Sequence, residues 1–313
     1  MTTTEIAVVG AGGWGTAIAL VLAKRGHKVT MWARRRDFCA QLQRSRENTQ
    51  YLPGILLPAG IEITNDLNAA VAGKGVIVIA TPSKAVRGTV EALKGVVGSH
   101  ATIVSLSKGF ERETLLRCSE VIAEVAGNEE RVVALSGPNH AEEVARGIPT
   151  ATVAAGNSPQ AAKAVQDIFM TPKFRVYTNP DIVGVEVAGA LKNIIALAAG
   201  VCDGLGYGDN TKAALMTRGI AEITRMGIKL GAQPVTFAGL AGIGDLIATC
   251  TSKHSRSWRT GHALGRGESL DSILEKTGMV VEGVATTETA TKMAEQLSVS
   301  MPITTALWQV IIG

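Results

Sequence analysis

The chain has 313 residues, of which 46% are hydrophobic and 19% charged, as expected for a folded globular protein of about two domains. A net charge of +4 and an aromatic content of 4% argue against a nucleic-acid-binding protein, although a small positive charge suits anionic substrates. The four cysteines (Cys39, Cys118, Cys202 and Cys250) lie far apart, with no metal-binding spacing. This pattern predicts reduced thiols in a cytoplasmic protein.

No targeting or membrane segment is expected. Residues 1–5 lack a basic region followed by an apolar stretch, so no signal peptide is predicted. The most apolar stretch, residues 183–201, carries Glu186, Lys192 and Asn193 near its middle. Because such groups are costly in lipid, this stretch is predicted to be a buried helix of a globular protein.

A glycine-rich stretch near the start gives the strongest local signal. Residues 6–9 predict a buried strand and residues 16–23 a helix, and between them stands Gly10-Ala11-Gly12-Gly13-Trp14-Gly15. In this fingerprint Gly10 makes the tight turn, Gly12 leaves room for a pyrophosphate, and Gly15 lets helix and strand pack closely. The helix N-terminus then favours the anion. The stretch predicts a dinucleotide site, and the alternative is a purely structural turn.

The remaining pattern predicts an α/β fold of two domains. Apolar strand-like runs are expected at residues 6–9, 28–32, 61–64, 76–80, 102–106, 132–136, 150–154 and 174–177. Helical patterns lie between most of them, notably at 34–50, 84–94, 113–126 and 159–170. Strands alternating with helices predict a parallel, doubly wound, Rossmann-type sheet.

After residue 179 the patterns are helical throughout, at 181–202, 209–231, 234–239, 256–266, 269–276 and 283–297. We therefore expect a dinucleotide-binding domain over 1–179 and an all-helical substrate-binding and catalytic domain over 180–313. The chain stops at Gly313 inside a helical pattern without a cap, so we expect the C-terminal tail to be incomplete.

Arginines follow the second predicted strand, at Arg34 and Arg35, where a carboxylate usually holds the adenosine ribose of NAD. Arginine there favours the 2′-phosphate of NADP. Use of NAD stays open, and the alternative is a solvated start of a basic helix.

The apolar stretch at 183–201 carries the sharpest catalytic signal. A helix that is apolar all round is buried, so Lys192 cannot easily reach water. Burial disfavours the ammonium form and lowers its pKa toward the range of a general acid or base. The alternative is that Lys192 pairs with Glu186 for structure alone, while the neighbouring Asn193 is a candidate substrate contact.

Two later segments could face this lysine. Asp245 and Thr249 stand four residues apart, on one face if the segment is helical, and the alternative for Asp245 is an N-cap. Residues 252–259 combine cations and hydroxyls at a predicted helix start, which suits a phosphate; the alternative is a surface turn. Residues 107–109 and 136–140 follow strands, where open α/β sheets bind ligands.

Together these motifs resemble the bacterial-type NAD(P)-dependent glycerol-3-phosphate dehydrogenases. The resemblance covers essentially the whole chain and rests on motifs that occur in order at residues 10–17, 108–109, 136–138, 175–181, 191–194, 244–246, 249–251, 255–256 and 281–283. It implies reversible reduction of dihydroxyacetone phosphate to sn-glycerol 3-phosphate, the backbone precursor of glycerophospholipids. It also implies NADP(H) or NAD(H) as cofactor, no metal, and a cytoplasmic homodimer that acts on a small phosphate rather than on membranes or nucleic acid.

The resemblance also implies roles for individual residues. Lys192 is the proton donor and acceptor, and Lys108 contacts substrate and cofactor. Asp245 and Thr249 complete the polar catalytic ring around the reacting carbon. The other implied substrate contacts are Gly137, Asn139, Asp245, Ser255, Arg256 and Ser257. The implied cofactor contacts, besides Lys108 and Arg256, are Gly10, Gly12, Gly13, Trp14, Gly15, Arg34, Arg35, Ala141, Val280 and Glu282.

Two positions depart from the family pattern. Asn139 stands where the family often has Thr or Ser, so this contact would come from an amide, and Ser257 stands where it usually has Asn. The competing interpretations are another two-domain hydroxy-acid or sugar-acid dehydrogenase and a non-catalytic dinucleotide sensor. The first would need an arginine-lined carboxylate pocket, and the second has no use for a desolvated lysine.

Overall fold

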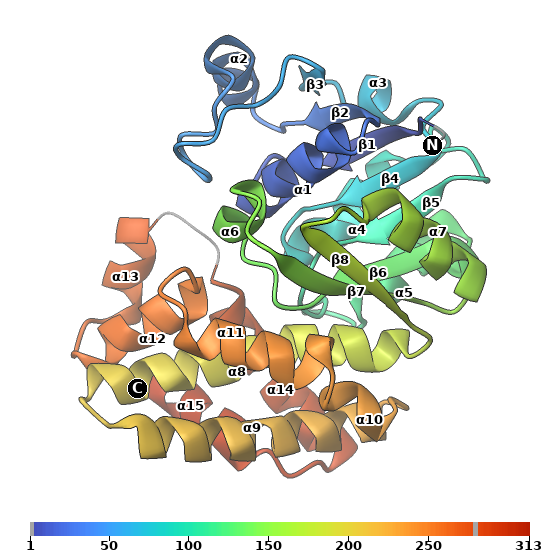
Figure 1. Ribbon diagram of the computed structural model, residues 1–313. Coiled ribbons are helices and arrows are strands. Elements are labelled where there is room, and N and C mark those ends of the chain that lie inside the picture. Colours follow the sequence, from blue (N-terminus) through green and yellow to red (C-terminus); the bar gives the residue numbers. More distant parts are fainter. Residues whose placement is uncertain (1–2, 278–280) are drawn as a thin grey trace. The chain divides into compact units, whose positions relative to one another are not determined.

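The structure is a computed structural model that describes residues 3–277 and 281–313, and it divides into two compact units (Figure 1). Unit 1 comprises Met1–Ser107 and Cys118–Ile182, and unit 2 comprises Lys108–Arg117 and Val183–Gly313. The sequence predicts a single boundary near residue 179, which places residues 108–117 in the first domain. In the structure this short segment packs with unit 2.

Unit 1 is built on an eight-stranded sheet with the strand order β3-β2-β1-β4-β5-β6-β7-β8. Its strands are β1 (Glu5–Val9), β2 (Lys28–Trp32), β3 (Ile61–Thr64), β4 (Val76–Ile79), β5 (Thr102–Ser105), β6 (Val132–Ser136), β7 (Thr150–Gly156) and β8 (Phe174–Asn179). All neighbours pair in parallel except β6 and β7, which pair antiparallel. The doubly wound fold class is confirmed, but β7 and β8 both run opposite to the other six strands, which the sequence did not predict.

Helices and turns connect these strands. They are α1 (Gly13–Lys24), α2 (Arg36–Ser45), α3 (Leu67–Val71), η1 (Ser83–Ala85), α4 (Val86–Ala92), α5 (Cys118–Ala126), η2 (Glu129–Arg131), α6 (Ala141–Ala145) and α7 (Pro159–Phe169). The prediction of a helix over 113–126 is wrong at its start, because α5 begins at Cys118 and the preceding residues form a loop closed by a β-bridge between Phe110 and Arg117.

The order of the strands determines where unit 1 can bind a ligand. The chain leaves β1 toward β2 on one side of the sheet and leaves β4 toward β5 on the other, so β1 and β4 flank the point where the strand order reverses. Ligands of open α/β sheets bind at the carboxyl ends of the strands at such a point. The glycine-rich loop that follows β1 lies there.

Apart from residues 108–117, the described part of unit 2 is built from helices and the turns that join them (Figure 1). Its elements are α8 (Ile182–Gly204), α9 (Asp209–Lys229), α10 (Pro234–Phe237), the π-helical turn η3 (Leu240–Gly244), α11 (Asp245–Thr251), α12 (Arg256–Gly265), α13 (Leu270–Thr277), α14 (Glu282–Leu297) and α15 (Pro302–Ile312). The central helix is α8, whose side chains from Val187 to Ala199 form much of the hydrophobic core.

Two helical segments among the described residues are long and apolar enough to pass a test for a membrane span. They are Ile182–Gly204 and Pro234–Thr251, and 89% of the most apolar window of the first is buried inside the protein. A core helix of a globular domain passes the same test. The four cysteines are free thiols, as predicted, and three of them are buried.

Candidate active site

The glycine-rich loop of unit 1 has the geometry that the sequence predicts. Gly10 has φ +122°, and a Cβ built on it would lie 2.7 Å from the carbonyl oxygen of Ala80. A Cβ on Gly15 would lie 2.0 Å from the carbonyl oxygen of Gly10. Both positions therefore need glycine for the chain's own packing. A Cβ on Gly12, in contrast, meets nothing within 4 Å, so Gly12 leaves open space at the start of α1.

This open space adjoins a helix N-terminus that suits an anion. Gly12 is the N-cap of α1 without a side-chain cap, and the first turn carries no acidic residue. The unpaired backbone N–H groups and the helix dipole both favour a phosphate there. Asn48, fully buried, holds the loop by donating from Nδ2 to the carbonyl oxygen of Ala11 (3.0 Å) and to Thr16 Oγ1 (2.8 Å). Local patterns in the sequence do not predict this support, because Asn48 is distant along the chain.

Arg34 and Arg35 follow β2 but differ in what they contact. Arg35 is already engaged, since its Nη2 donates to Gln50 Oε1 (2.9 Å) and its guanidinium lies 5.4 Å from the Phe38 ring centroid. The exposed side chain of Arg34 has no hydrogen bond or ion pair with any residue in the described part of the chain. Arg34 is therefore the better placed of the two to bind a phosphate.

Buried polar groups without partners gather at the carboxyl ends of the strands. Among the described residues they are Trp14 Nε1, Thr81 Oγ1, Ser105 Oγ and Ser136 Oγ. The three hydroxyls stand at or just after the ends of β4, β5 and β6. Because a buried polar atom without a partner is costly, this set fits a polar ligand that would satisfy some of these atoms. Open space at Gly12 and these orphaned atoms fit a dinucleotide.

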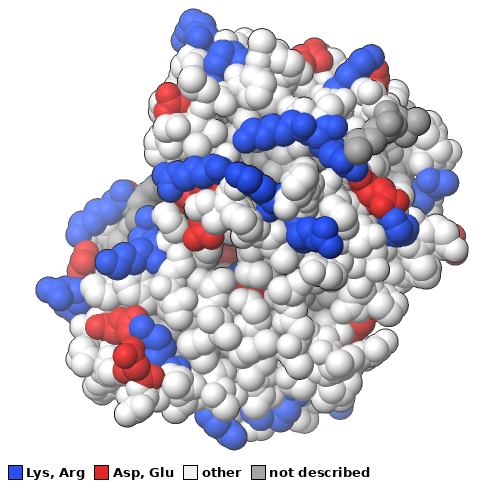
Figure 2. Space-filling view, in the orientation of Figure 1, with Lys and Arg blue, Asp and Glu red and all other residues white. Residues whose placement is uncertain are grey.

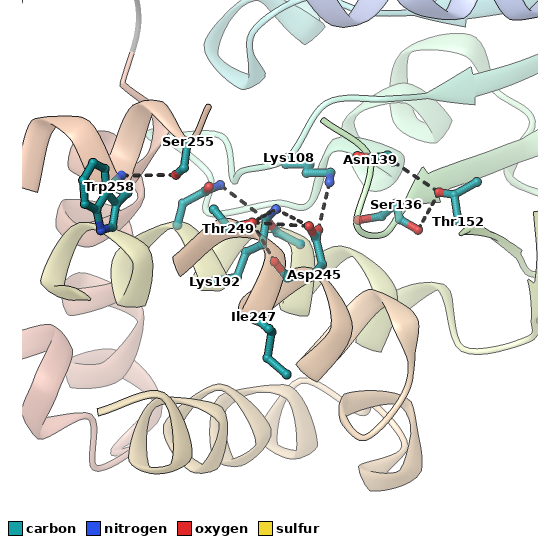
Figure 3. A network of polar contacts seen from close by, with 12 residues as sticks. Lys108, Ser136, Asn139, Thr152, Lys192, Asp245, Ile247, Thr249, Ser255 and Trp258 are labelled. Carbon is teal, nitrogen blue, oxygen red and sulfur yellow. Dashed lines mark hydrogen bonds and ion pairs between the residues drawn. The ribbon is translucent and has the colours of Figure 1, made fainter. Parts of the chain in front are cut away.

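The segment after β6 is held by β7. Thr152 Oγ1 donates to the carbonyl oxygen of Ser136 (3.0 Å) and accepts from Asn139 Nδ2 (3.2 Å) (Figure 3). A Cβ on Gly137 would lie 3.0 Å from Thr152 Cα, so glycine allows this close approach. Ala141, the next predicted contact, is the first residue of α6.

Unit 2 brings four predicted residues into one cluster, in which two lysines share one carboxylate (Figure 3). Lys192 Nζ, from α8, donates to Asp245 Oδ1 and to Thr249 Oγ1 (2.6 Å). Lys108 Nζ donates to the other oxygen, Asp245 Oδ2 (2.9 Å). Thr249 Oγ1 donates to the carbonyl oxygen of Asp245 (2.6 Å). Asp245 and Thr249 thus share one face of α11. Asp245 is the first residue of this helix, and its side chain does not cap it.

Burial and charge set the protonation of this cluster. Desolvation lowers the pKa of Lys192 to about 8, and the nearby Lys108 lowers it too, whereas Asp245 opposes the shift. Burial alone would raise the pKa of Asp245, but the two ammonium groups outweigh it and lower that pKa. The result is a carboxylate that stays ionised beside a lysine able to gain and lose a proton near neutral pH.

Lys192 also retains hydrogen-bonding capacity. Within the described residues, its hydrogen-bond acceptors are Asp245 and Thr249, which use two of the three N–H groups of an ammonium. The Thr249 hydroxyl directs its own hydrogen to the backbone of α11, so it accepts from Lys192. One N–H is left for a substrate oxygen.

The predicted phosphate site lies at the start of α12. Ser255 is its N-cap, accepting at Oγ from the backbone N–H of Trp258 (3.1 Å) (Figure 3). Arg256 is exposed, whereas Ser255 and Ser257 are buried. Ser257 packs beside Gly283, where a Cβ would lie 2.8 Å from its hydroxyl. Arg256, the Ser255 hydroxyl hydrogen and the backbone N–H groups of this helix start are the groups best able to bind an anion.

Close backbone contact between α8 and α12 holds this helix start relative to Lys192. A Cβ on Gly200 would lie 2.1 Å from the carbonyl oxygen of Trp258, and one on Gly261 only 1.9 Å from that of Leu197. Such distances allow no side chain at either position. The two helices that carry Lys192 and Arg256 therefore pack backbone to backbone.

The structure also corrects one alternative. Glu186 does not pair with Lys192: it accepts from Arg117 Nη1 at 2.6 Å, in an ion pair that sequence reasoning missed. Asn193, on α8 beside Lys192, donates to the carbonyl oxygen of Gly189 (3.4 Å). Glu282 is the first residue of α14, and Val280 lies outside the described residues. No cluster of His, Cys, Asp and Glu suited to a metal occurs among the described residues.

Charged side chains on the face drawn in Figure 2 are of both signs, with Asp and Glu between the Lys and Arg groups. Much of that face is uncharged. The lysine cluster is therefore distinguished by its burial and pairing, since basic side chains on the surface are common.

Comparison with known proteins agrees with these features. The family model described as "NAD-dependent glycerol-3-phosphate dehydrogenase N-terminus" matches residues 5–162, and the corresponding C-terminus model matches residues 181–313. A protein from Geobacillus kaustophilus named glycerol-3-phosphate dehydrogenase [NAD(P)+] is 55% identical over 309 residues, which cover 98% of this chain and 90% of that protein.

Solved structures show the same similarity. The glycerol-3-phosphate dehydrogenase of Coxiella burnetii superposes with a TM-score of 0.95 at 37% identity, covering 99% of this chain and 94% of that one. The yeast enzyme (Saccharomyces cerevisiae) superposes with a TM-score of 0.85 at 29% identity, covering 99% and 96%.

Proposed function

The chain belongs to the NAD-dependent glycerol-3-phosphate dehydrogenase family, and on this premise we propose a role for each polar group of the site. The activity is NAD(P)-dependent oxidoreduction of glycerol 3-phosphate. Oxidation of the secondary alcohol at C2 gives dihydroxyacetone phosphate, and the reverse reaction reduces that ketone. The bound nicotinamide supplies and accepts the hydride. The protein must supply a proton, orientation and anion binding.

Lys192 is the proposed general acid and base. As an ammonium it donates its third N–H to the C2 oxygen and protonates the alkoxide that forms during reduction; as an amine it takes the proton of the alcohol during oxidation. The observation that carries this proposal is the buried Lys192 Nζ, with two N–H groups fixed by Asp245 and Thr249 and a pKa of about 8. A group with this pKa serves both directions near neutral pH.

The other members of the cluster tune and orient this lysine. Asp245 stabilises the ammonium form of the buried Lys192 and compensates the repulsion between it and the partly exposed Lys108. Thr249 fixes the direction of Lys192 Nζ by accepting one N–H. Lys108 adds positive charge beside Lys192, which lowers the pKa of Lys192 and favours release of its proton to substrate.

Substrate and cofactor contacts complete the proposal. Arg256, Ser255 and the start of α12 bind the substrate phosphate. The buried Ser257 is part of the same first turn of α12. Asn193, Gly137 and Asn139 are the further substrate contacts that the family resemblance implies. The glycine-rich loop of unit 1 binds the pyrophosphate, with Trp14, Ala141 and Glu282 as further cofactor contacts. Arg34 favours the 2′-phosphate of NADP because its side chain is exposed and uncommitted among the described residues. Supported by the family resemblance, we further propose a cytoplasmic homodimer that feeds glycerophospholipid synthesis.

The decisive experiment follows the absorbance of NADPH and of NADH when dihydroxyacetone phosphate is added to the purified protein. We expect oxidation of NADPH and, more weakly, of NADH. The same assay with a 2-keto acid tests the hydroxy-acid alternative and should give no turnover. Binding of NADPH without oxidation under any condition would reject the enzyme proposal in favour of a sensor.

A further inference from the structure

Residues 108–117, which we call the strap, leave the sheet of unit 1 after β5 and pack with unit 2. The strap closes on itself through a β-bridge between Phe110 and Arg117. Its backbone adds hydrogen bonds from Glu111 N–H to Leu116 O and from Leu115 N–H to Glu111 O, both 2.9 Å. These bonds make the strap a compact loop whose two ends are held together.

The strap contacts unit 2 through side chains at three further places. Phe110, 5% exposed, is part of the hydrophobic core of unit 2. Arg112 pairs with Glu288 of α14 at 2.7 Å, but its side chain is 65% exposed. Arg117 pairs with Glu186 of α8 at 2.6 Å, with side chains only 12% and 6% exposed. The Arg117 pair is therefore the buried ionic contact of the strap with the central helix.

This contact is linked to the catalytic cluster through the loop itself. Because Phe110 and Arg117 are bridged, fixing Arg117 on α8 also fixes Phe110. Lys108 precedes Phe110 by two residues and reaches Asp245 at 2.9 Å. Glu186 and Lys192 stand six residues apart on α8, about 9 Å along the helix axis. Lys192 is itself a residue of α8, whereas Lys108 is held on α8 indirectly, through the Arg117–Glu186 ion pair.

We propose that the buried Arg117–Glu186 ion pair is a positioning device for catalysis, which anchors the strap on α8 and thereby holds Lys108 Nζ against Asp245. The inference rests on the proposed function of Lys108 and adds two residues that touch neither substrate nor cofactor in that proposal. A buried ion pair contributes little net stability compared with apolar packing, so its presence is better accounted for by the geometry that it specifies.

The charges around Lys192 provide a specific readout. The groups that face Lys192 include Lys108 from the strap and, from α11, Asp245, Thr249 and Cys250. Direct loss of the Glu186 charge would lower the pKa of Lys192, so a rise in that pKa reports that Lys108 has moved. Withdrawal of the Lys108 ammonium raises the pKa of Lys192.

The test compares Glu186→Gln with Lys108→Met and with the double variant, using dihydroxyacetone phosphate and NADPH. We expect Glu186→Gln to lower kcat/KM by about tenfold or more, because displacing a catalytic group by about 1 Å has effects of this size. The alkaline limb of the reduction should move to higher pH in both single variants. In the Lys108→Met background, Glu186→Gln should have no further effect. Arg112→Gln, which removes the exposed ion pair of the same strap, is the matched control and should behave as wild type.

A second readout is independent of catalysis. Amide hydrogen exchange of residues 110–117, followed by mass spectrometry, should be faster in Glu186→Gln and unchanged in Arg112→Gln. If exchange is faster in Glu186→Gln but Lys108→Met has wild-type kinetics, the strap is anchored by the ion pair and the proposed role of Lys108 is rejected. Unchanged exchange in Glu186→Gln would overturn the inference. So would a double variant whose loss of kcat/KM equals the product of the losses in Glu186→Gln and Lys108→Met. If Glu186→Gln fails to fold, Glu186→Asp keeps the charge one methylene shorter; wild-type exchange and kinetics there would overturn it equally.

Discussion

The glycine-rich loop of unit 1 and the lysine cluster of unit 2 achieve function in opposite ways. The loop is six consecutive residues, and each of its three fingerprint glycines has a local steric cause or leaves open space. The cluster is formed by residues far apart along the chain, with separations of 137 between Lys108 and Asp245 and 53 between Lys192 and Asp245. The loop works through backbone shape, whereas the cluster works through burial and charge.

This difference teaches where each kind of variant should act. Backbone shape determines which cofactor binds, so changes in the loop should alter cofactor affinity or folding. Burial and charge determine the protonation of Lys192, so changes in the cluster should alter turnover and its pH dependence. A loop variant that changed only turnover, or a cluster variant that changed only cofactor affinity, would contradict this difference.

The largest effect is expected for Lys192→Met, which removes the ammonium and keeps an apolar side chain of similar length. Because general acid–base catalysis contributes about 10²–10⁴-fold, kcat should fall by about that factor. The affinity for NADPH, measured by calorimetry, should stay near that of the wild type, since unit 1 holds the loop. Lys229→Met, at an exposed position of α9, is the control. A variant with more than about a tenth of the wild-type kcat would remove Lys192 from the proton-transfer step.

The pH dependence should have opposite signs in the two directions. Reduction needs the ammonium form of Lys192, so kcat should be constant below a pKa of about 8 and fall above it, by about tenfold per pH unit. Oxidation needs the amine, so kcat should rise up to about the same pH and then level off. Profiles measured at saturating substrate check this. Profiles that rise or fall together would assign the proton transfer to another group.

Two glycines of the loop separate folding from binding. Gly15→Ala places a Cβ 2.0 Å from a carbonyl oxygen, so it should lower the free energy of unfolding by about 1–3 kcal/mol or more. Gly12→Ala places its Cβ in open space, so the melting temperature should be near wild type while the Kd for NADPH rises by about tenfold. Thermal melts and cofactor titration measure the two effects. If Gly15→Ala loses as much cofactor affinity as Gly12→Ala and is as stable as the wild type, the structural role of Gly15 is contradicted.

The sequence predicts features that depend on neighbouring residues and misses those that depend on residues far apart along the chain. The strands β2, β3 and β6 have the predicted bounds, because apolar runs and their breaks are local. The sequence identifies Lys192, because a single lysine in an apolar helix signals burial. It does not identify the partner of Lys192: both Glu186 and Asp245 are available, and only the fold shows that Glu186 pairs with Arg117. The reversed strands β7 and β8 and the strap likewise depend on long-range packing, which periodicity does not report.

The last expected effect is on cofactor preference and concerns Arg34. Replacing Arg34 with Gln removes a charged contact to the 2′-phosphate, so the KM for NADPH should rise about five- to twentyfold, while the KM for NADH, which lacks this phosphate, should change less than twofold. Arg36→Gln is the matched control, since Arg36 is also exposed but is already part of α2. Steady-state assays with both cofactors at fixed dihydroxyacetone phosphate give the comparison. An equal rise in both KM values would show that Arg34 contacts a part common to the two cofactors, and the preference for NADP would then have to come from elsewhere in unit 1.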